Sequence, residues 1–90
     1  TSPTFVLLKS YKLSTLNSQF STLAHIDAYR MQDENDALSI GITDFLGKSD
    51  TITIIEWAEK IKKLLPKNTT YINFKHLNEN SRQITIQHSN

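Results

Sequence analysis

The sequence predicts an α/β fold with a mixed sheet, formed by a single domain over residues 1–90. Three observations predict this fold. Runs of strand-forming residues lie near both ends of the chain. The middle of the chain changes to helical spacing. One nearly continuous β-branched run, of the kind found in buried strands, lies between two helical segments. The predicted order is two strands, two short helices, one strand, one helix and two strands.

The first half of the chain contains two strand patterns followed by a helical pattern. Residues 4–11 (TFVLLKSY) and 20–29 (FSTLAHIDAY) have the composition of strands, and we expect them to pair as a hairpin. Residues 33–50 place apolar side chains three and four positions apart, which favours helix. Asp33 can cap this helical segment, and Gly41 is expected to divide it into two short helices.

The second half predicts a buried strand, a helix and a terminal hairpin. Residues 51–57 (TITIIEW) are typical of a strand that is buried on both faces. Residues 57–65 predict a helix that ends before Pro66. Its expected apolar face consists of Trp57, Ile61, Leu64 and Leu65. Residues 69–77 and 82–88 alternate on either side of the turn sequence NENS, which predicts a hairpin.

Composition excludes several classes of protein. The chain has no cysteine, so it has neither disulfides nor a thiolate metal site, and this fits a reducing cytoplasm. No apolar run approaches the ~20 residues that a membrane span needs, and the first residues do not form a signal-peptide pattern. The formal net charge of +1 gives no bulk electrostatic argument for nucleic-acid binding. We therefore expect a cytoplasmic protein.

The stretch AHIDAYR contains the first candidate site. His25, Asp27 and Tyr29 occupy alternate positions, so a strand would display an imidazole, a carboxylate and a phenol on one face. Arg30 follows at the end of the strand. The alternative is a solvated strand face, or a local hydrogen bond between His25 and Asp27.

Glu56 is the second candidate because it follows the β-branched strand directly. Ligands of open α/β sheets bind at the carboxyl ends of strands. A carboxylate placed there can hold a magnesium ion or orient an attacking water. Trp57 is placed to stack on a base or to close the site. The alternative is a strand that ends in a solvated charge, followed by an inward-packed tryptophan.

Other patterns do not support a site. GKS at 47–49 resembles the end of a phosphate-binding loop, but Gly41 lies one residue too far back, and the order of helix and strand is reversed. No histidine pair has the spacing of a zinc site, and no G-x-S-x-G elbow occurs. A group of lysines is more typical of a solvated helix face than of an RNA or protein patch: Lys60, Lys62, Lys63 and Lys67.

Four stretches occur together in one order: SPTF (2–5), HIDAYR (25–30), IIEWAEKIKKLLP (54–66) and the terminal hairpin. In this respect the chain resembles, over nearly all of its length, the TsaE family. Members of that family are the bacterial ATPase subunits that support threonylcarbamoyladenosine formation on tRNA. The resemblance implies a P-loop NTPase-like fold, ATP and Mg²⁺ as cofactors, and the TsaD and TsaB subunits as partners.

The resemblance also implies roles for four residues. Thr4 of SPTF would supply a hydroxyl close to the metal or the terminal phosphate. Asp27 would act on the γ-phosphate side, and Glu56 would serve the magnesium ion. Trp57 would lie close to the nucleotide. Tyr29 and Arg30 also match the family pattern, without an implied role.

One departure from the family pattern limits this expectation. Family members carry a glycine-rich phosphate loop, with its lysine and Ser/Thr, upstream of SPTF, and this sequence starts after that point. We therefore expect a truncated domain without the P-loop strand and its helix, which alone neither hydrolyses ATP nor binds it tightly.

Three alternatives remain open from the sequence. The chain is part of such an ATPase, or it is a non-catalytic module or remnant that docks on a partner, or it is a small RNA-binding domain. The near-neutral charge disfavours the last of these. Exposed sheet edges would also allow a homodimer.

Overall fold

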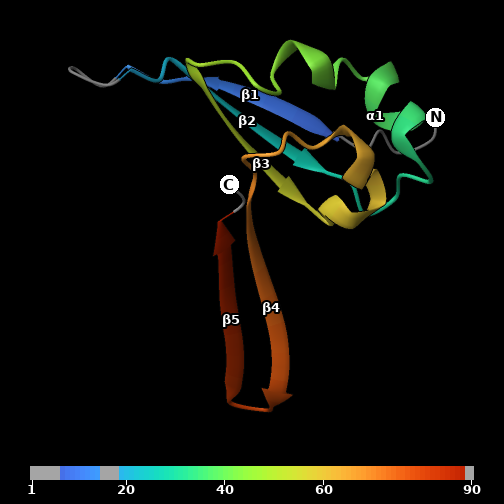
Figure 1. Ribbon diagram of the computed structural model, residues 1–90, viewed down its shortest axis with the longest axis vertical. Helices are drawn as coiled ribbons and strands as arrows, with labels where there is room; N and C mark the ends of the chain where they lie inside the picture. The colour runs from blue at the N-terminus through green and yellow to red at the C-terminus, as the bar shows by residue number, and fades with distance from the viewer. Residues whose placement is uncertain (1–6, 15–18, 89–90) are drawn as a thin grey trace, which may run out of the picture.

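The computed structural model describes residues 7–14 and 19–88. Within this part, three strands form one sheet in the order β1-β2-β3 (Figure 1). These strands are β1 (Leu8–Lys12), β2 (Thr22–Asp27) and β3 (Thr51–Glu56). β1 is antiparallel to β2, whereas β2 is parallel to β3. The predicted α/β fold with a mixed sheet is therefore confirmed.

β2 lies at the centre of this sheet and carries its buried face. Ala24, Ile26 and Ala28 alternate along the strand and its end, and each is 0% exposed. The intervening side chains point to the opposite face because successive residues of a strand alternate. The burial pattern that the FSTLAHIDAY alternation predicts is thus present, and it directs the polar residues of the strand outward.

Two short helical segments follow β2, as the sequence predicts. α1 (Glu34–Ser39) begins at Asp33, whose carboxylate accepts a hydrogen bond of 2.9 Å from the Asn35 backbone N–H. Gly41, at φ +85°, separates α1 from the 3₁₀ turn η1 (Ile42–Asp44). A residue with a side chain is strained at this φ, so glycine is the residue that allows the helix to stop here.

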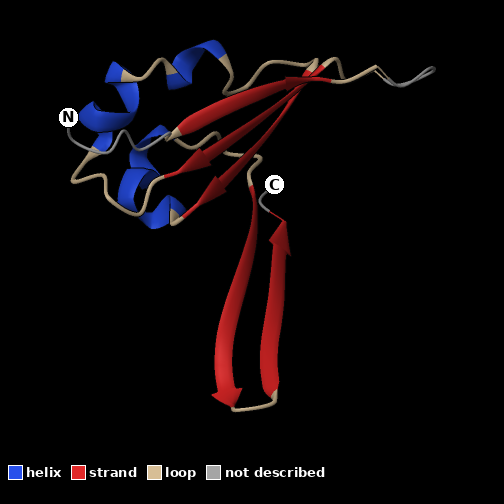
Figure 2. Cartoon of the chain, turned by 180° about the vertical axis from the view of Figure 1, so that it is seen from behind, coloured by secondary structure: helices blue, strands red, loops and turns tan. Residues whose placement is uncertain are grey.

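A small apolar core joins β2 to these helical segments. Its buried members are Ile26, Ala28, Met31, Ala37, Ile42 and Ile61. The helices gather near the ends of β2 and β3 (Figure 2). The core therefore holds the carboxyl ends of β2 and β3 in place.

The segment after β3 differs from the predicted helix. η2 (Ala58–Leu64) consists of 3₁₀ turns, and its backbone breaks at Ile61 (φ −131°, ψ 34°). Leu65 is extended, as expected for a residue that precedes a proline. Trp57 has φ +59° and is 50% exposed, so it does not belong to the buried face with Ile61. The chain turns too sharply at Trp57 for one regular helix to form.

β3 also differs from the prediction of burial on both faces. Its residues alternate between half-buried and exposed, and Ile52 and Ile54 are 38% and 50% exposed. Ile55 packs against the core, and Thr53 contacts the Phe45 carbonyl oxygen. Among the described residues, the helical segments cover only the face of β3 that carries Thr53 and Ile55. The face that carries Ile52 and Ile54 is left open.

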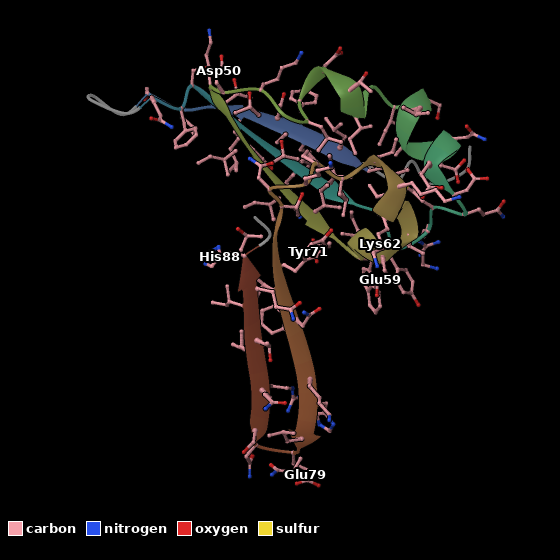
Figure 3. All side chains as sticks on the ribbon, viewed as in Figure 1. Asp50, Glu59, Lys62, Tyr71, Glu79 and His88 are labelled. Carbon is pink, nitrogen blue, oxygen red and sulfur yellow. The ribbon has the colours of Figure 1, made fainter. Side chains whose placement is uncertain are left out.

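The chain ends in a long hairpin that projects from the three-stranded sheet (Figures 1 and 2). It consists of β4 (Thr70–Asn78) and β5 (Ser81–His88), and the register shifts between His76 and Asn78. Glu79 lies at the distal turn, whereas Tyr71 and His88 lie at the end nearest the sheet (Figure 3). The predicted terminal hairpin is therefore confirmed.

Replacing the N-cap of α1 should lower stability measurably. We expect Asp33→Ala to reduce the free energy of unfolding by about 1 kcal/mol, because the Asn35 N–H loses its acceptor. Urea denaturation monitored by circular dichroism measures this change. Gln32→Ala is the control, since Gln32 is exposed and its side chain does not cap the helix. Equal effects of the two substitutions would contradict the capping role.

Candidate functional site

The carboxyl ends of β2 and β3 bring two predicted site residues together. Asp27 and Glu56 are partners in the parallel register of these strands. The Ala28 N–H donates to the Glu56 carbonyl oxygen at 3.0 Å, which continues the pairing just beyond Asp27. Side chains at paired positions of a parallel ladder project from the same face of the sheet. Asp27 and Glu56 therefore project from the same face at the carboxyl ends of the two strands, where ligands of α/β sheets bind.

His25 holds the Glu56 side chain. Its Nε2 lies 2.6 Å from Glu56 Oε1, and the two side chains are 41% and 55% exposed. With an ionised carboxylate, this hydrogen bond requires a proton on Nε2. The sequence alternative of a bond between His25 and Asp27 is not what the structure shows, because the imidazole reaches across to the neighbouring strand.

Asp27 is oriented by the chain that follows it. Its Oδ1 accepts a hydrogen bond of 3.0 Å from the Tyr29 backbone N–H, which is an Asx-type turn. This bond occupies one carboxylate oxygen and fixes the direction in which the chain leaves β2. The two carboxylates thus have separate supports: a backbone N–H for Asp27 and an imidazole for Glu56.

Trp57 borders the same corner in an unusual backbone conformation. It has φ +59° and ψ 41°, the left-handed region that non-glycine residues rarely adopt. Its ring centroid lies 4.9 Å from that of Tyr29, with the planes tilted by 58°. The two rings are 50% and 55% exposed. Backbone strain of this kind is retained mainly at functional sites, and here it sets an aromatic pair beside the carboxylates.

The sequence predicts which residues belong to the site but not which side chains contact one another. Nothing in the spacing of HIDAYR or IIEW indicates that His25 contacts Glu56 or that Tyr29 contacts Trp57. Both contacts depend on the parallel pairing of β2 with β3, which joins segments about 30 positions apart. The sequence patterns predict the two strands but do not predict that they are neighbours in the sheet.

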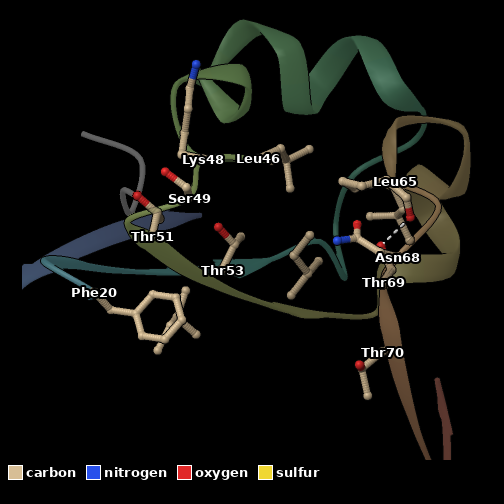
Figure 4. Close-up of a pocket in the computed structure, with 14 residues that line it drawn as sticks. Phe20, Leu46, Lys48, Ser49, Thr51, Thr53, Leu65, Asn68, Thr69 and Thr70 are labelled. Atoms are coloured by element: carbon tan, nitrogen blue, oxygen red, sulfur yellow. Dashed lines mark hydrogen bonds between the residues drawn. The ribbon is translucent and has the colours of Figure 1, made fainter. Parts of the chain in front are cut away.

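Thr4 is outside the described residues. The GKS stretch precedes β3 and follows a helical turn, so it has the wrong context for a phosphate loop. Its residues line a separate cavity of about 680 Å³ (Figure 4), and Thr53 and Leu65 lie on other walls of this cavity. Lys48 is the titratable residue of that lining, which gives the cavity no acid–base pair.

The candidate site could bind a magnesium ion, which needs few protein ligands, more readily than a metal that is coordinated entirely by protein side chains. The described residues contain no group of three or more His, Asp or Glu side chains placed to hold a metal. Magnesium is commonly bound through one or two carboxylates, with waters and substrate phosphates completing its octahedron. Glu56 could supply one such oxygen ligand, and the contact from His25 would orient it.

Comparison with known proteins decides the family. The family model described as "Threonylcarbamoyl adenosine biosynthesis protein TsaE" matches residues 1–84. The chain belongs to the TsaE family. The resemblance seen in the four sequence stretches and the α/β architecture are both consistent with this membership.

Several curated relatives carry the name tRNA threonylcarbamoyladenosine biosynthesis protein TsaE. The relative from Rickettsia bellii is 36% identical over 85 residues, which is 94% of this chain and 54% of that protein. The Bacillus subtilis relative is 33% identical over 85 residues, covering 94% and 49%. The Treponema pallidum relative is 34% identical over 86 residues, covering 96% and 58%. This TsaE chain thus spans about half the length of the curated relatives it matches.

None of the helices in the described ranges has the length and apolar character needed to cross a membrane.

Proposed function

We propose that this chain supplies the magnesium-binding corner of a TsaE-type ATPase that supports threonylcarbamoyladenosine formation on tRNA. The observation that carries the proposal is the pairing of Asp27 with Glu56 at the carboxyl ends of parallel strands. The family membership and the names of the relatives support the tRNA-modification role.

The proposed reaction is phosphoryl transfer from ATP to water. This chemistry demands little covalent participation by the protein, but it requires positioned charges and a positioned water. When bound, a magnesium ion would neutralise part of the negative charge on the phosphate oxygens. Glu56 would hold that ion, and the 2.6 Å contact from His25 would keep the carboxylate in one orientation.

Asp27 has a different proposed role. Its Oδ1 is held by the Tyr29 N–H, so the carboxylate has a fixed direction beside Glu56. A carboxylate in this position can accept a hydrogen bond from the attacking water on the γ-phosphate side. Thr4 is proposed to supply a hydroxyl close to the metal or the terminal phosphate.

The aromatic pair is proposed to contact the nucleotide. Tyr29 and Trp57 are both about half exposed, and their rings are tilted against each other rather than stacked. One face of Trp57 therefore remains accessible to a base, and base–aromatic stacking is favourable by about 1–3 kcal/mol per base.

The proposed partners of the ATPase are the TsaD and TsaB subunits, whose cycle it would reset through ATP hydrolysis.

A chimera tests the proposal. Replacing the matched 85 residues of the Bacillus subtilis relative with this chain places the candidate site in a full-length TsaE setting. We expect magnesium-dependent ATP hydrolysis by the chimera. We also expect restored threonylcarbamoyladenosine in the tRNA of cells depleted of their own TsaE, measured by mass spectrometry of nucleosides. A folded chimera that has neither activity would overturn the proposal.

A further inference from the structure

The charges of the chain are unevenly distributed along its sequence. Residues 57–69 contain four lysines and one acidic residue, which gives this stretch a formal charge of +3. The rest of the chain contains six basic and eight acidic residues, a formal charge of −2. The overall charge of +1 therefore averages a basic stretch with an acidic remainder. The basic segment is defined as residues 60–67, which hold Lys60, Lys62, Lys63 and Lys67.

The packing of η2 directs lysines of the basic segment to the surface. Ile61 is 0% exposed, and Leu64 packs against the core cluster. The three-residue spacing of these two apolar side chains is the period of a 3₁₀ turn. Lys60 and Lys63 precede them with the same spacing, and both are exposed. Burial of the apolar residues thus turns the preceding lysines toward solvent.

The ammonium groups of the basic segment are free of ion pairs within the ranges that the structure describes. The carboxylate of Glu34 approaches the segment, but its Oε2 accepts from the backbone N–H of Lys63, at 3.3 Å. This hydrogen bond links α1 to η2. The backbone of the segment is therefore attached to the neighbouring helix, while its ammonium groups remain in solvent.

Lys67 lies in an ordered turn at the end of the basic segment. Thr69 donates twice to the Pro66 carbonyl oxygen, from its N–H at 3.2 Å and from its hydroxyl at 2.6 Å. Proline also restricts the backbone at the start of this turn. A backbone that is ordered before binding loses less conformational entropy when a partner is bound.

We propose that the basic segment is an interaction surface for RNA, which it binds through the phosphate groups. The choice of RNA rests on the proposed function, since the relatives are named for a modification of tRNA. The position of the segment fits this role. η2 begins directly after Trp57, so bound RNA would lie close to the corner that is proposed to bind ATP.

The chemistry of lysine favours RNA over an acidic protein as the partner. Interfaces between proteins are enriched in arginine and depleted in lysine. The arginine fork matches a carboxylate with two hydrogen bonds, whereas lysine is a point charge on a flexible stem. All four cations of the basic segment are lysines. Point charges of this kind suit phosphate groups, which they contact without reading the sequence.

A pair of double variants tests the surface. Lys60→Gln combined with Lys63→Gln removes two positive charges from the basic segment. Lys9→Gln combined with Lys12→Gln is the matched control, because it removes the same charge from two exposed lysines of β1 that are also three positions apart. Glutamine is as good a helix former as lysine. The hydrogen bond from the Lys63 N–H to Glu34 does not involve the replaced side chain.

Fluorescence anisotropy measures the binding of unfractionated tRNA to the chain, without nucleotide, over a range of salt concentrations. Near physiological salt we expect a dissociation constant of about 10⁻⁴–10⁻⁶ M, the range for phosphate contacts alone. The variant of the basic segment should bind about tenfold more weakly at low salt, and the slope of log affinity against log salt should fall by about 2. The β1 control should keep the affinity and the slope of the unsubstituted chain.

Glu34→Gln should have the opposite effect. Glutamine retains an oxygen that can accept from the Lys63 N–H, but the negative charge beside the basic segment is lost. We expect the affinity for tRNA to rise about threefold, because this carboxylate repels phosphate groups. A substitution that only loosened the structure would lower the affinity.

Poly-glutamate, titrated in the same way, tests the acidic protein as the alternative partner. We expect it to bind more weakly than tRNA at the same salt concentration. Tighter binding of poly-glutamate would assign the surface to an acidic protein and overturn the proposal. Absence of tRNA binding, or equal losses in the two double variants, would overturn it as well.

These outcomes are separate from those for the proposed function. Binding of tRNA by the chain, together with an inactive chimera, retains the RNA surface and removes the ATPase role. An active chimera, together with a chain that does not bind tRNA, retains the ATPase role and removes the RNA surface.

Discussion

Ile26→Ala should lower the free energy of unfolding by about 2–5 kcal/mol. Ile26 is 0% exposed near the carboxyl end of β2 and belongs to the core cluster with residues from the helical segments. Truncation removes apolar atoms from the core and leaves a cavity that neighbouring strands cannot fill without moving. Small domains have a total stability of about 5–15 kcal/mol, so one such change removes a large part of the margin.

Urea denaturation monitored by far-ultraviolet circular dichroism measures this loss. Ile54→Ala is the matched control, because it removes the same atoms from the adjacent strand at a side chain that is 50% exposed. In the isolated chain we expect that control to cost about 1 kcal/mol or less. Similar losses for the two variants would mean that the face of Ile54 is covered in solution, contrary to the open face described above.

Local chemistry made much of the fold predictable. The alternation in β2 corresponds to the faces that the structure buries and exposes, and the alternating runs around NENS correspond to the two strands of the terminal hairpin. Asp33 and Gly41 indicate where α1 begins and where it stops, because a carboxylate can cap an N-terminus and glycine can adopt a positive φ. These signals act within a few residues, so a single sequence is sufficient to read them.

Features that depend on distant segments were not predictable in the same way. The run TITII predicts burial on both faces of β3, but burial depends on what packs against the strand, and the described helical segments cover one face. The spacing of 57–65 favours a helix, yet the sharp turn at Trp57 and the break at Ile61 produce 3₁₀ turns. The contact of His25 with Glu56 likewise exists only because β2 and β3 pair in parallel.

The candidate site was therefore predictable as a set of residues but not as an arrangement. The sequence predicts Asp27, Glu56 and Trp57 as site residues, and the structure places them at the carboxyl ends of β2 and β3. Tyr29 and His25 gain their place from contacts across strands. The proposed magnesium ligand, Glu56, is thus contacted by a residue of the neighbouring strand, His25.

In the chimera, Glu56→Gln should reduce magnesium-dependent ATP hydrolysis by about 100-fold. Glutamine keeps the size of the side chain and can still hydrogen-bond to His25, but it removes the negative charge proposed to hold the ion. Charge stabilisation by a metal in phosphoryl transfer is favourable by several kcal/mol, and each 1.36 kcal/mol is about tenfold in rate. Hydrolysis measured over a range of magnesium concentrations should show a higher magnesium requirement as well as a lower maximal rate.

Glu59→Gln is the matched control for this variant. Glu59 lies on η2, three positions beyond Glu56, and is exposed. This substitution removes one negative charge close to the site but leaves the Glu56 carboxylate that His25 contacts. We expect its hydrolysis to match that of the unsubstituted chimera. Unchanged hydrolysis in Glu56→Gln would assign the metal to other residues. A loss that is equal in both variants would attribute the effect to the general negative charge of this surface rather than to a ligand at Glu56.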